Sequence, residues 1–187
     1  MTAEMNYYHE RQWLGHCAIH TLNNLLQSHS FTYQTLKAIS NQLYSEDMRM
    51  NGNHRPLCSL NPYHSHIPYL GYFDISCIVM ALKTKDCEIV NHLLRVQDVD
   101  HLELNSPLTI GFILNLNNSS LFGLWNSRHW FSILYDQEHK SFVNLDSQLS
   151  EPEIFLNEKS FLQFLKNSIQ ENSAQIFVIS RIAFTGG

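Results

Sequence analysis

The spacing of apolar residues changes partway along the chain, and this change constrains the fold more than any other feature. In residues 17–27, apolar side chains recur three and four positions apart, which predicts a helix. The same spacing predicts helices over 32–44, 75–82 and 158–170. Short apolar runs bounded by turn residues predict strands over 87–90, 109–116, 130–135, 141–145 and 175–182. Helices early and strands late favour an α+β fold with an antiparallel sheet.

The length and charge of the chain narrow its class. A chain of 187 residues, of which 44% are hydrophobic, suits one domain with a packed core and a modest insertion. The net charge is −5 and no basic stripe is visible, so we expect no nucleic-acid partner. No window approaches the roughly 18 apolar residues of a membrane span, and the first residues lack a signal layout. We therefore expect a cytoplasmic monomer, with nuclear residence also open.

One segment differs in character from the rest. Residues 51–72 are rich in Asn, His, Pro and Gly, a composition that predicts an irregular loop rather than a helix or strand. Asp74, directly after it, is suited to begin the next helix as its N-cap.

Four cysteines raise the question of which one is reactive. Cys17, Cys58, Cys77 and Cys87 include no CxxC pair, and a chain of this size needs no disulfide framework, so a reducing compartment is expected. Three of them are expected to be small buried apolar residues. Cys17 differs because it lies in the first turn of the helix predicted for 17–27. Unpaired backbone N–H groups and the helix dipole stabilise an anion there, which favours the reactive thiolate.

A thiolate nucleophile needs a base, and His129 is the best placed of the eleven histidines. It lies at the mouth of the hairpin predicted over 130–145. With a four-residue loop at 136–139, Tyr135 pairs with Lys140, and His129 then faces Asp146 on the same side of the sheet. An aspartate there would orient the imidazole and stabilise its charged form. A five-residue loop would place the two on opposite faces, so the pairing depends on a register that the sequence leaves open.

Other polar residues near Cys17 allow competing interpretations. Gln12 precedes Cys17 by five residues, and its amide could donate to an oxyanion together with the Cys17 N–H; a glutamine there is otherwise simply solvent-facing. His16 and His20 have the spacing of a helical metal pair. A zinc site needs at least three protein ligands, and no further pair has suitable spacing. We therefore expect no metal and no other cofactor.

Four blocks of sequence resemble the Josephin family. Residues 8–27, YHERQWLGHCAIHTLNNLLQ, contain the glutamine, cysteine, histidine and LNNLLQ of its first signature. GYFDISCIVMAL, residues 71–82, is similar to the second block, and RHWFSILY with FVNLDSQL, within residues 128–149, matches the last ones. The blocks follow the family's order and span nearly the whole chain. The length and the aspartate of NLDS resemble the small members of the family.

This resemblance implies a fold and a reaction. It implies a papain-like cysteine protease fold, with helices packed on an antiparallel sheet, in a single catalytic domain over 1–187 with a mobile helical arm at about 31–69. The implied reaction is thiol-dependent hydrolysis of the (iso)peptide bond after the C-terminal glycine of ubiquitin. By position, Cys17 is the nucleophile, His129 the general acid and base, Asp146 the residue that orients His129, and Gln12 the oxyanion donor.

The resemblance also implies the partner. Ubiquitin or polyubiquitin chains would dock partly on the helix of the second block, where Ile75 matches a contact position. Two alternatives remain open at this point. The chain could be a ubiquitin-binding module with weak or no catalysis, gated by the arm, or a metal-binding regulator that uses His16 and His20.

Overall fold

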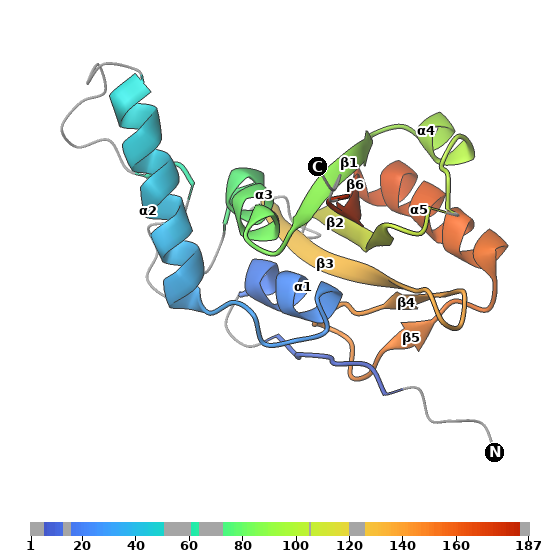
Figure 1. Cartoon of the computed structure of the whole chain (residues 1–187). Coiled ribbons are helices and arrows are strands. Elements are labelled where there is room, and N and C mark those ends of the chain that lie inside the picture. Colours follow the sequence, from blue (N-terminus) through green and yellow to red (C-terminus); the bar gives the residue numbers. More distant parts are fainter. Residues whose placement is uncertain are drawn as a thin grey trace.

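The computed structural model describes residues 6–12, 16–50, 61–63, 73–104, 106–119 and 126–183. Within this part of the chain, six strands form one sheet in the order β1-β6-β2-β3-β4-β5, and every neighbouring pair is antiparallel. The predicted α+β class with helices on an antiparallel sheet is therefore confirmed (Figure 1). The strands are β1 (Cys87–Leu93), β2 (Thr109–Ser119), β3 (Asn126–Asp136), β4 (Ser141–Asn144), β5 (Glu153–Ile154) and β6 (Gln175–Arg181). The helices are α1 (Cys17–Leu25), α2 (Tyr33–Met50), α3 (Ile75–Lys83), α4 (Val96–Asp100) and α5 (Glu158–Asn172).

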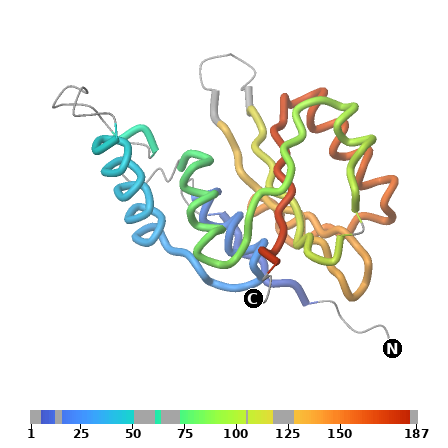
Figure 2. The backbone as a smooth tube through the Cα atoms, turned by 45° about the horizontal axis from the view of Figure 1, so that its top comes forward, coloured from blue at the N-terminus to red at the C-terminus, as the bar shows by residue number. Residues whose placement is uncertain are grey.

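Helices cover both faces of the sheet because its strands bury side chains on both sides. Along β6, Phe177 joins the apolar cluster under α1 and α3, whereas its neighbour Val178 joins the cluster under α5. Successive strand residues point to opposite faces, so one strand supplies both cores. Figure 2 shows α5 across the sheet from α1 and α3. The helix that begins at Cys17 is thus packed on a sheet that is itself supported from behind.

Helix α2 is attached to the rest of the fold over a short stretch. Only Leu36 and Ser40 of its residues are buried, and in Figure 1 the helix projects away from the sheet beside α3. Thr32 begins it as predicted, since the Thr35 N–H donates to the Thr32 hydroxyl at 3.3 Å. The helix runs to Met50, beyond the predicted end at residue 44. The irregular segment expected at 51–72 lies outside the described residues, except for 61–63.

Every predicted helix and strand is present, and the structure adds two short elements that were not predicted. Asp74 begins α3 as predicted, because its carboxylate accepts from the Ser76 N–H at 2.9 Å. Helix α4 has five residues and β5 has two. Neither is long enough to show a periodic pattern of apolar residues, so the sequence offered no signal for them.

The predicted register of the β3–β4 hairpin is wrong. Tyr135 pairs with Phe142 and not with Lys140, so the turn covers 137–140 and lies one residue later than expected. The physical reason is Asp136, which remains in β3 opposite Ser141. Its carboxylate accepts from the backbone N–H groups of residues 138 and 139, at 2.9 and 3.0 Å, and so organises the turn behind it. The register shift is two residues, an even number, which preserves the face of each side chain.

Gly111 lies where β2 crosses beneath α1, and we predict that alanine there destabilises the fold. Its φ is +151°, at an irregularity in the pairing of β2 with β6. A Cβ would come within 2.2 Å of the Ile133 carbonyl oxygen and 2.8 Å of Leu25 on α1. Gly111→Ala should therefore lower the free energy of unfolding by about 3 kcal/mol, measured by urea denaturation. Ile110→Val is the control and should cost under about 1.5 kcal/mol; equal values for the two would contradict the argument.

Candidate active site

Cys17 is the first residue of α1 and is almost completely buried, with 2% of its surface exposed. The N-cap residue, His16, makes no side-chain hydrogen bond to the helix end. The backbone N–H groups of the first turn are therefore not capped by that side chain, and groups of this kind are the donors that an anion at a helix start can use. The local sequence explains the placement, since Ala18, Leu22 and Leu25 bury one side of α1 in the same apolar cluster as Cys17.

His129 lies on β3 and links Cys17 to Asp146. Its Nε2 donates to Asp146 Oδ1 at 2.7 Å, and the ring also hydrogen-bonds to Cys17, which leaves Nδ1 for the sulfur. Burial alone would lower the pKa of His129, but the hydrogen bonds to Asp146 and Cys17 outweigh it and raise the pKa from 6.5 to about 9. The imidazolium is thus the stable form at neutral pH. Its charge lies in a dry environment, because His129 is only 4% exposed.

Asp146 reaches His129 by a route other than the predicted cross-strand pairing. Strand β4 ends at Asn144, so Asp146 lies past the strand, in the turn that follows. At His129 the edge of β3 is no longer covered by β4, and this turn occupies it instead. The Asp146 N–H donates to the side-chain oxygen of Asn144 at 3.1 Å, and Asp146 Oδ1 accepts from the Gln148 N–H at 2.9 Å. These bonds hold the carboxylate toward the ring.

Gln148 is a residue at this site that the sequence analysis missed. Its side-chain Nε2 lies 3.4 Å from His129 Nδ1, the ring atom on the side of Cys17. Gln148 is exposed whereas His129 is buried, so it covers the ring on the solvent side. Its amide can present either a donor or an acceptor to the ring. The sequence could have indicated Gln148 by its position two residues after Asp146, because an aspartate side chain often accepts a hydrogen bond from the backbone N–H two residues later.

Gln12 is joined to this group through Ser147. The Gln12 N–H donates to the Ser147 carbonyl oxygen at 2.7 Å, and the Ser147 hydroxyl donates to Gln12 Oε1 at 3.3 Å. The carbonyl end of the Gln12 amide is thus engaged by the turn that carries Asp146. This leaves the N–H₂ end for another acceptor, which is the chemistry an oxyanion donor requires.

Ile75 is not part of this chain of contacts. It is half-buried in the first turn of α3 and packs against the apolar cluster that includes Cys17. The structure brings Cys17, His129, Asp146 and Gln12 together through direct hydrogen bonds and Ser147, and places Ile75 on a neighbouring helix.

The other described cysteines have different environments. Burial, with the nearby negative charge of Asp74, raises the pKa of Cys77 to about 12, and its thiol donates to the Tyr63 carbonyl oxygen. Burial also raises the pKa of Cys87, which donates to the Lys85 carbonyl oxygen at 3.2 Å. Both therefore remain thiols at neutral pH. Cys58 lies outside the described residues.

The histidines considered for a metal pair have other neighbours. His20 Nδ1 lies 2.7 Å from a carboxylate oxygen of Glu10, and the His16 ring packs against Tyr33 with centroids 5.5 Å apart. Among the described ranges, no group of three or more His, Cys, Asp or Glu side chains is arranged to hold a metal ion.

None of the described helices is long and apolar enough to cross a membrane.

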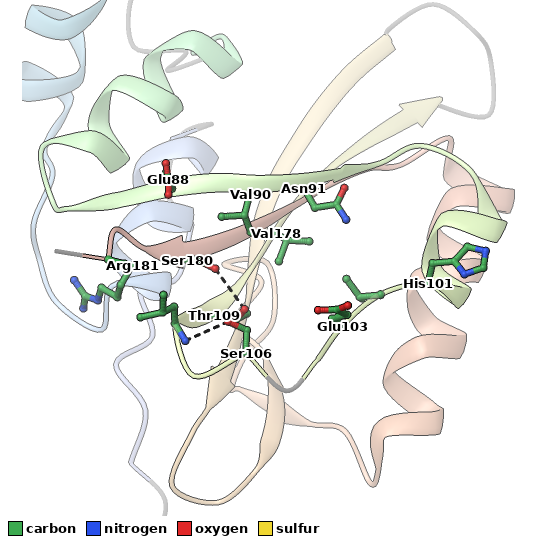
Figure 3. Close-up of a pocket in the computed structure, with 13 residues that line it drawn as sticks. Glu88, Val90, Asn91, His101, Glu103, Ser106, Thr109, Val178, Ser180 and Arg181 are labelled. Atoms are coloured by element: carbon green, nitrogen blue, oxygen red, sulfur yellow. Dashed lines mark hydrogen bonds between the residues drawn. The ribbon is translucent and has the colours of Figure 1, made fainter. Parts of the chain in front are cut away.

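A pocket of about 430 Å³ lies elsewhere, beside β1 and β6. Glu88, Asn91, Glu103 and Arg181 are among its lining residues, and Figure 3 shows them around it. None of the candidate site residues is among the residues that line this pocket.

Comparison of the chain with known proteins matches it to one family and to several members of that family. The Josephin family model matches residues 12–180. A Josephin-like protein of Arabidopsis thaliana is 32% identical over 170 residues, 89% of this chain and 46% of the relative. Human Josephin-2 is 31% identical over 176 residues, 92% of this chain and 85% of the relative. Human ataxin-3 is 28% identical over 179 residues, 92% of this chain and 45% of the relative. The chain thus spans about half of the Arabidopsis relative and of ataxin-3.

Proposed function

The chain belongs to the Josephin family, and on this premise we propose that it is a thiol-dependent deubiquitinase acting as a single catalytic domain. The substrate would be the (iso)peptide bond after the C-terminal glycine of ubiquitin, the reaction implied by the sequence resemblance. The proposal assigns Cys17 as nucleophile, His129 as general acid and base, Asp146 as the residue that orients His129, and Gln12 as an oxyanion donor.

One observation carries this proposal. A cysteine at the start of a helix, with a buried histidine hydrogen-bonded to it and an aspartate 2.7 Å behind that histidine, is the arrangement that thiol hydrolysis needs. The raised pKa of His129 supports the assignment, because an imidazolium both stabilises the thiolate and holds the proton that the leaving amine requires.

Each step of the reaction has a residue suited to it. The thiolate of Cys17 attacks the carbonyl carbon of the terminal glycine, and the carbonyl oxygen becomes an oxyanion. The Cys17 N–H and the Gln12 amide donate to that oxyanion. As the C–N bond breaks, His129 gives its proton to the lysine amine, which leaves. Neutral His129 then takes a proton from water, whose oxygen attacks the thioester and releases ubiquitin with a free carboxylate and Cys17 as thiolate.

Access to the sulfur sets a condition on the substrate. Cys17 and His129 are both buried, and Gln148 covers the ring on the solvent side. The extended C-terminal tail of ubiquitin is narrow because it ends in two glycines, which suits a narrow approach. We propose that Ile75 on α3 contributes to docking of the ubiquitin body, while the tail enters at Gln148.

Turnover of di-ubiquitin tests the proposal. The protein, kept reduced, is incubated with di-ubiquitins of each linkage at several enzyme concentrations, with Cys17→Ala alongside, and free ubiquitin is quantified over time. Release that requires Cys17 is the expected result. Binding of di-ubiquitin without any release, at every enzyme concentration, would instead identify a ubiquitin-binding module.

A further inference from the structure

Asn24 connects the three parts of the chain that carry the candidate catalytic residues. It is on α1, two turns after Cys17, and is completely buried. Its Oδ1 accepts from the Glu10 N–H at 2.6 Å, and its Nδ2 donates to the Glu10 carbonyl oxygen at 3.2 Å. The same Nδ2 donates to the Leu145 carbonyl oxygen at 2.9 Å. One amide therefore holds both the segment before Cys17 and the chain leaving β4.

Both of these held backbone groups stand next to a proposed catalytic residue. Glu10 precedes Gln12 by two residues, and Leu145 directly precedes Asp146. The two segments also meet each other, since the Gln12 N–H donates to the Ser147 carbonyl oxygen and His9 donates to that of Asp146 at 2.9 Å. Asn24 is the point where this pair of segments is tied to the helix that begins at Cys17.

Further contacts fix the first segment to α1 and to the loop that follows it, but they do not reach the second segment. The Glu10 carboxylate lies 2.7 Å from His20 Nδ1, 2.8 Å from His29 Nδ1 and 3.0 Å from Asn23 Nδ2. None of these bonds involves the chain around Asp146. Asn24 alone, among the described side chains of α1, is hydrogen-bonded to both segments.

We propose that Asn24 is a positioning residue that sets Gln12 and Asp146 relative to Cys17. This inference deepens the proposed function and rests on it for the roles of Gln12 and Asp146. Loss of the amide would free the chain before Asp146 from α1 and would weaken the hold of α1 on the segment that carries Gln12. A displacement of about 1 Å in a catalytic group can lower a rate about 10²-fold, so the effect should be large although Asn24 touches no reacting atom.

Asn23 offers a matched control. It is the same residue type on the same helix and is equally buried, with 0% exposure. It hydrogen-bonds the backbone of Ser30 and Phe31, at the turn toward α2, and the Glu10 carboxylate, but not the chain around Asp146. Asn23→Ala and Asn24→Ala both remove buried hydrogen bonds and should both lower the melting temperature. Only Asn24→Ala should also misplace Asp146.

The first experiment measures turnover of a fluorogenic ubiquitin substrate at a temperature where all variants are folded. Asn24→Ala should lower kcat by about 10- to 10²-fold with little change in KM, whereas Asn23→Ala should keep most of its kcat. Asn24→Asp keeps the acceptor for the Glu10 N–H but removes the donor to the Leu145 carbonyl oxygen. This variant replaces Asn24→Ala in the experiment if Asn24→Ala does not fold. Combined with Gln12→Ala, the Asn24 variant should lose less than the product of the single losses, because both act through Gln12.

The second experiment needs no ubiquitin and measures the rate of Cys17 alkylation by iodoacetamide as a function of pH. In Asn24→Ala the imidazolium loses a well-placed Asp146, so the alkylation profile should move relative to wild type, and in Asn23→Ala it should not. A profile unchanged by Asn24→Ala, or a kcat loss equal to that of Asn23→Ala and multiplicative with Gln12→Ala, overturns the inference. If wild type cleaves no ubiquitin substrate, the proposed function fails, and the alkylation profile still decides the role of Asn24.

Discussion

Cys17→Ala should reduce cleavage of ubiquitin chains to the background rate, a loss of at least about 10³-fold. The reason is that alanine offers no nucleophile, and the remaining residues can only position the substrate and stabilise an oxyanion. The same variant should not be labelled by a ubiquitin probe with an electrophile at its C-terminus. The measurements are gel-based di-ubiquitin cleavage and intact-mass analysis of the labelled protein. Cys17→Ala is expected to fold and to bind ubiquitin, because the substitution removes one buried sulfur at a helix end.

The remaining described cysteines serve as controls in the same experiment. Cys77 and Cys87 are fully buried and their raised pKa values keep them as thiols. Cys77→Ala and Cys87→Ala should therefore be labelled once per chain, as wild type is. Equal labelling of Cys17→Ala and wild type would disprove the assignment of the nucleophile.

His129→Asn should lower kcat by about 10²- to 10⁴-fold, because asparagine holds no proton for the leaving amine and no positive charge beside the thiolate. In wild type the pKa of His129 is raised to about 9 by the hydrogen bonds to Asp146 and Cys17. The value of kcat/KM should accordingly fall as pH rises through about 9, where the imidazolium loses its proton. His129→Asn should lack this fall. A wild-type profile that stays flat through this range would contradict the assigned role.

The same pKa predicts how stability depends on pH. The pKa of His129 in the folded chain lies above its ordinary value of 6.5, so the folded state binds the proton more tightly. The contribution to stability is fully present below about pH 6.5 and is lost as pH rises through about 9. The free energy of unfolding of wild type, compared with that of His129→Asn, should therefore decline over this interval. Urea denaturation at several pH values measures it.

Much of the candidate site could be predicted from local pattern. Asp74 was recognisable as an N-cap, and the helix beginning at Cys17 followed from apolar residues three and four positions apart. These features depend on residues within one or two turns, so a short window of sequence contains their cause. The choice of Cys17 among the cysteines had the same basis, because the stabilisation of a thiolate at a helix start is itself local.

The contact between His129 and Asp146 was predicted for a reason that proved incorrect. The expected register would have placed them directly opposite in a hairpin, but the turn lies one residue later and β4 ends before Asp146. The contact exists because the turn after β4 folds back along the edge of β3. A register depends on which side chains stabilise the turn, here Asp136, and apolar alternation alone does not distinguish registers two residues apart.

The sequence by itself thus determined the longer helices and strands, the α+β class and the cysteine at the start of α1, because each depends on short-range periodicity or helix-end chemistry. Only the tertiary structure decided what surrounds that cysteine. Gln148 reaches His129 across 19 positions, and Asn24 reaches Leu145 across 121. Such contacts arise when the sheet brings distant segments together, and residues so far apart leave no periodic signal in the chain. The sequence therefore pointed to Cys17 and to His129, Asp146 and Gln12 as its partners, and the packing of α1 on the sheet decided how they meet.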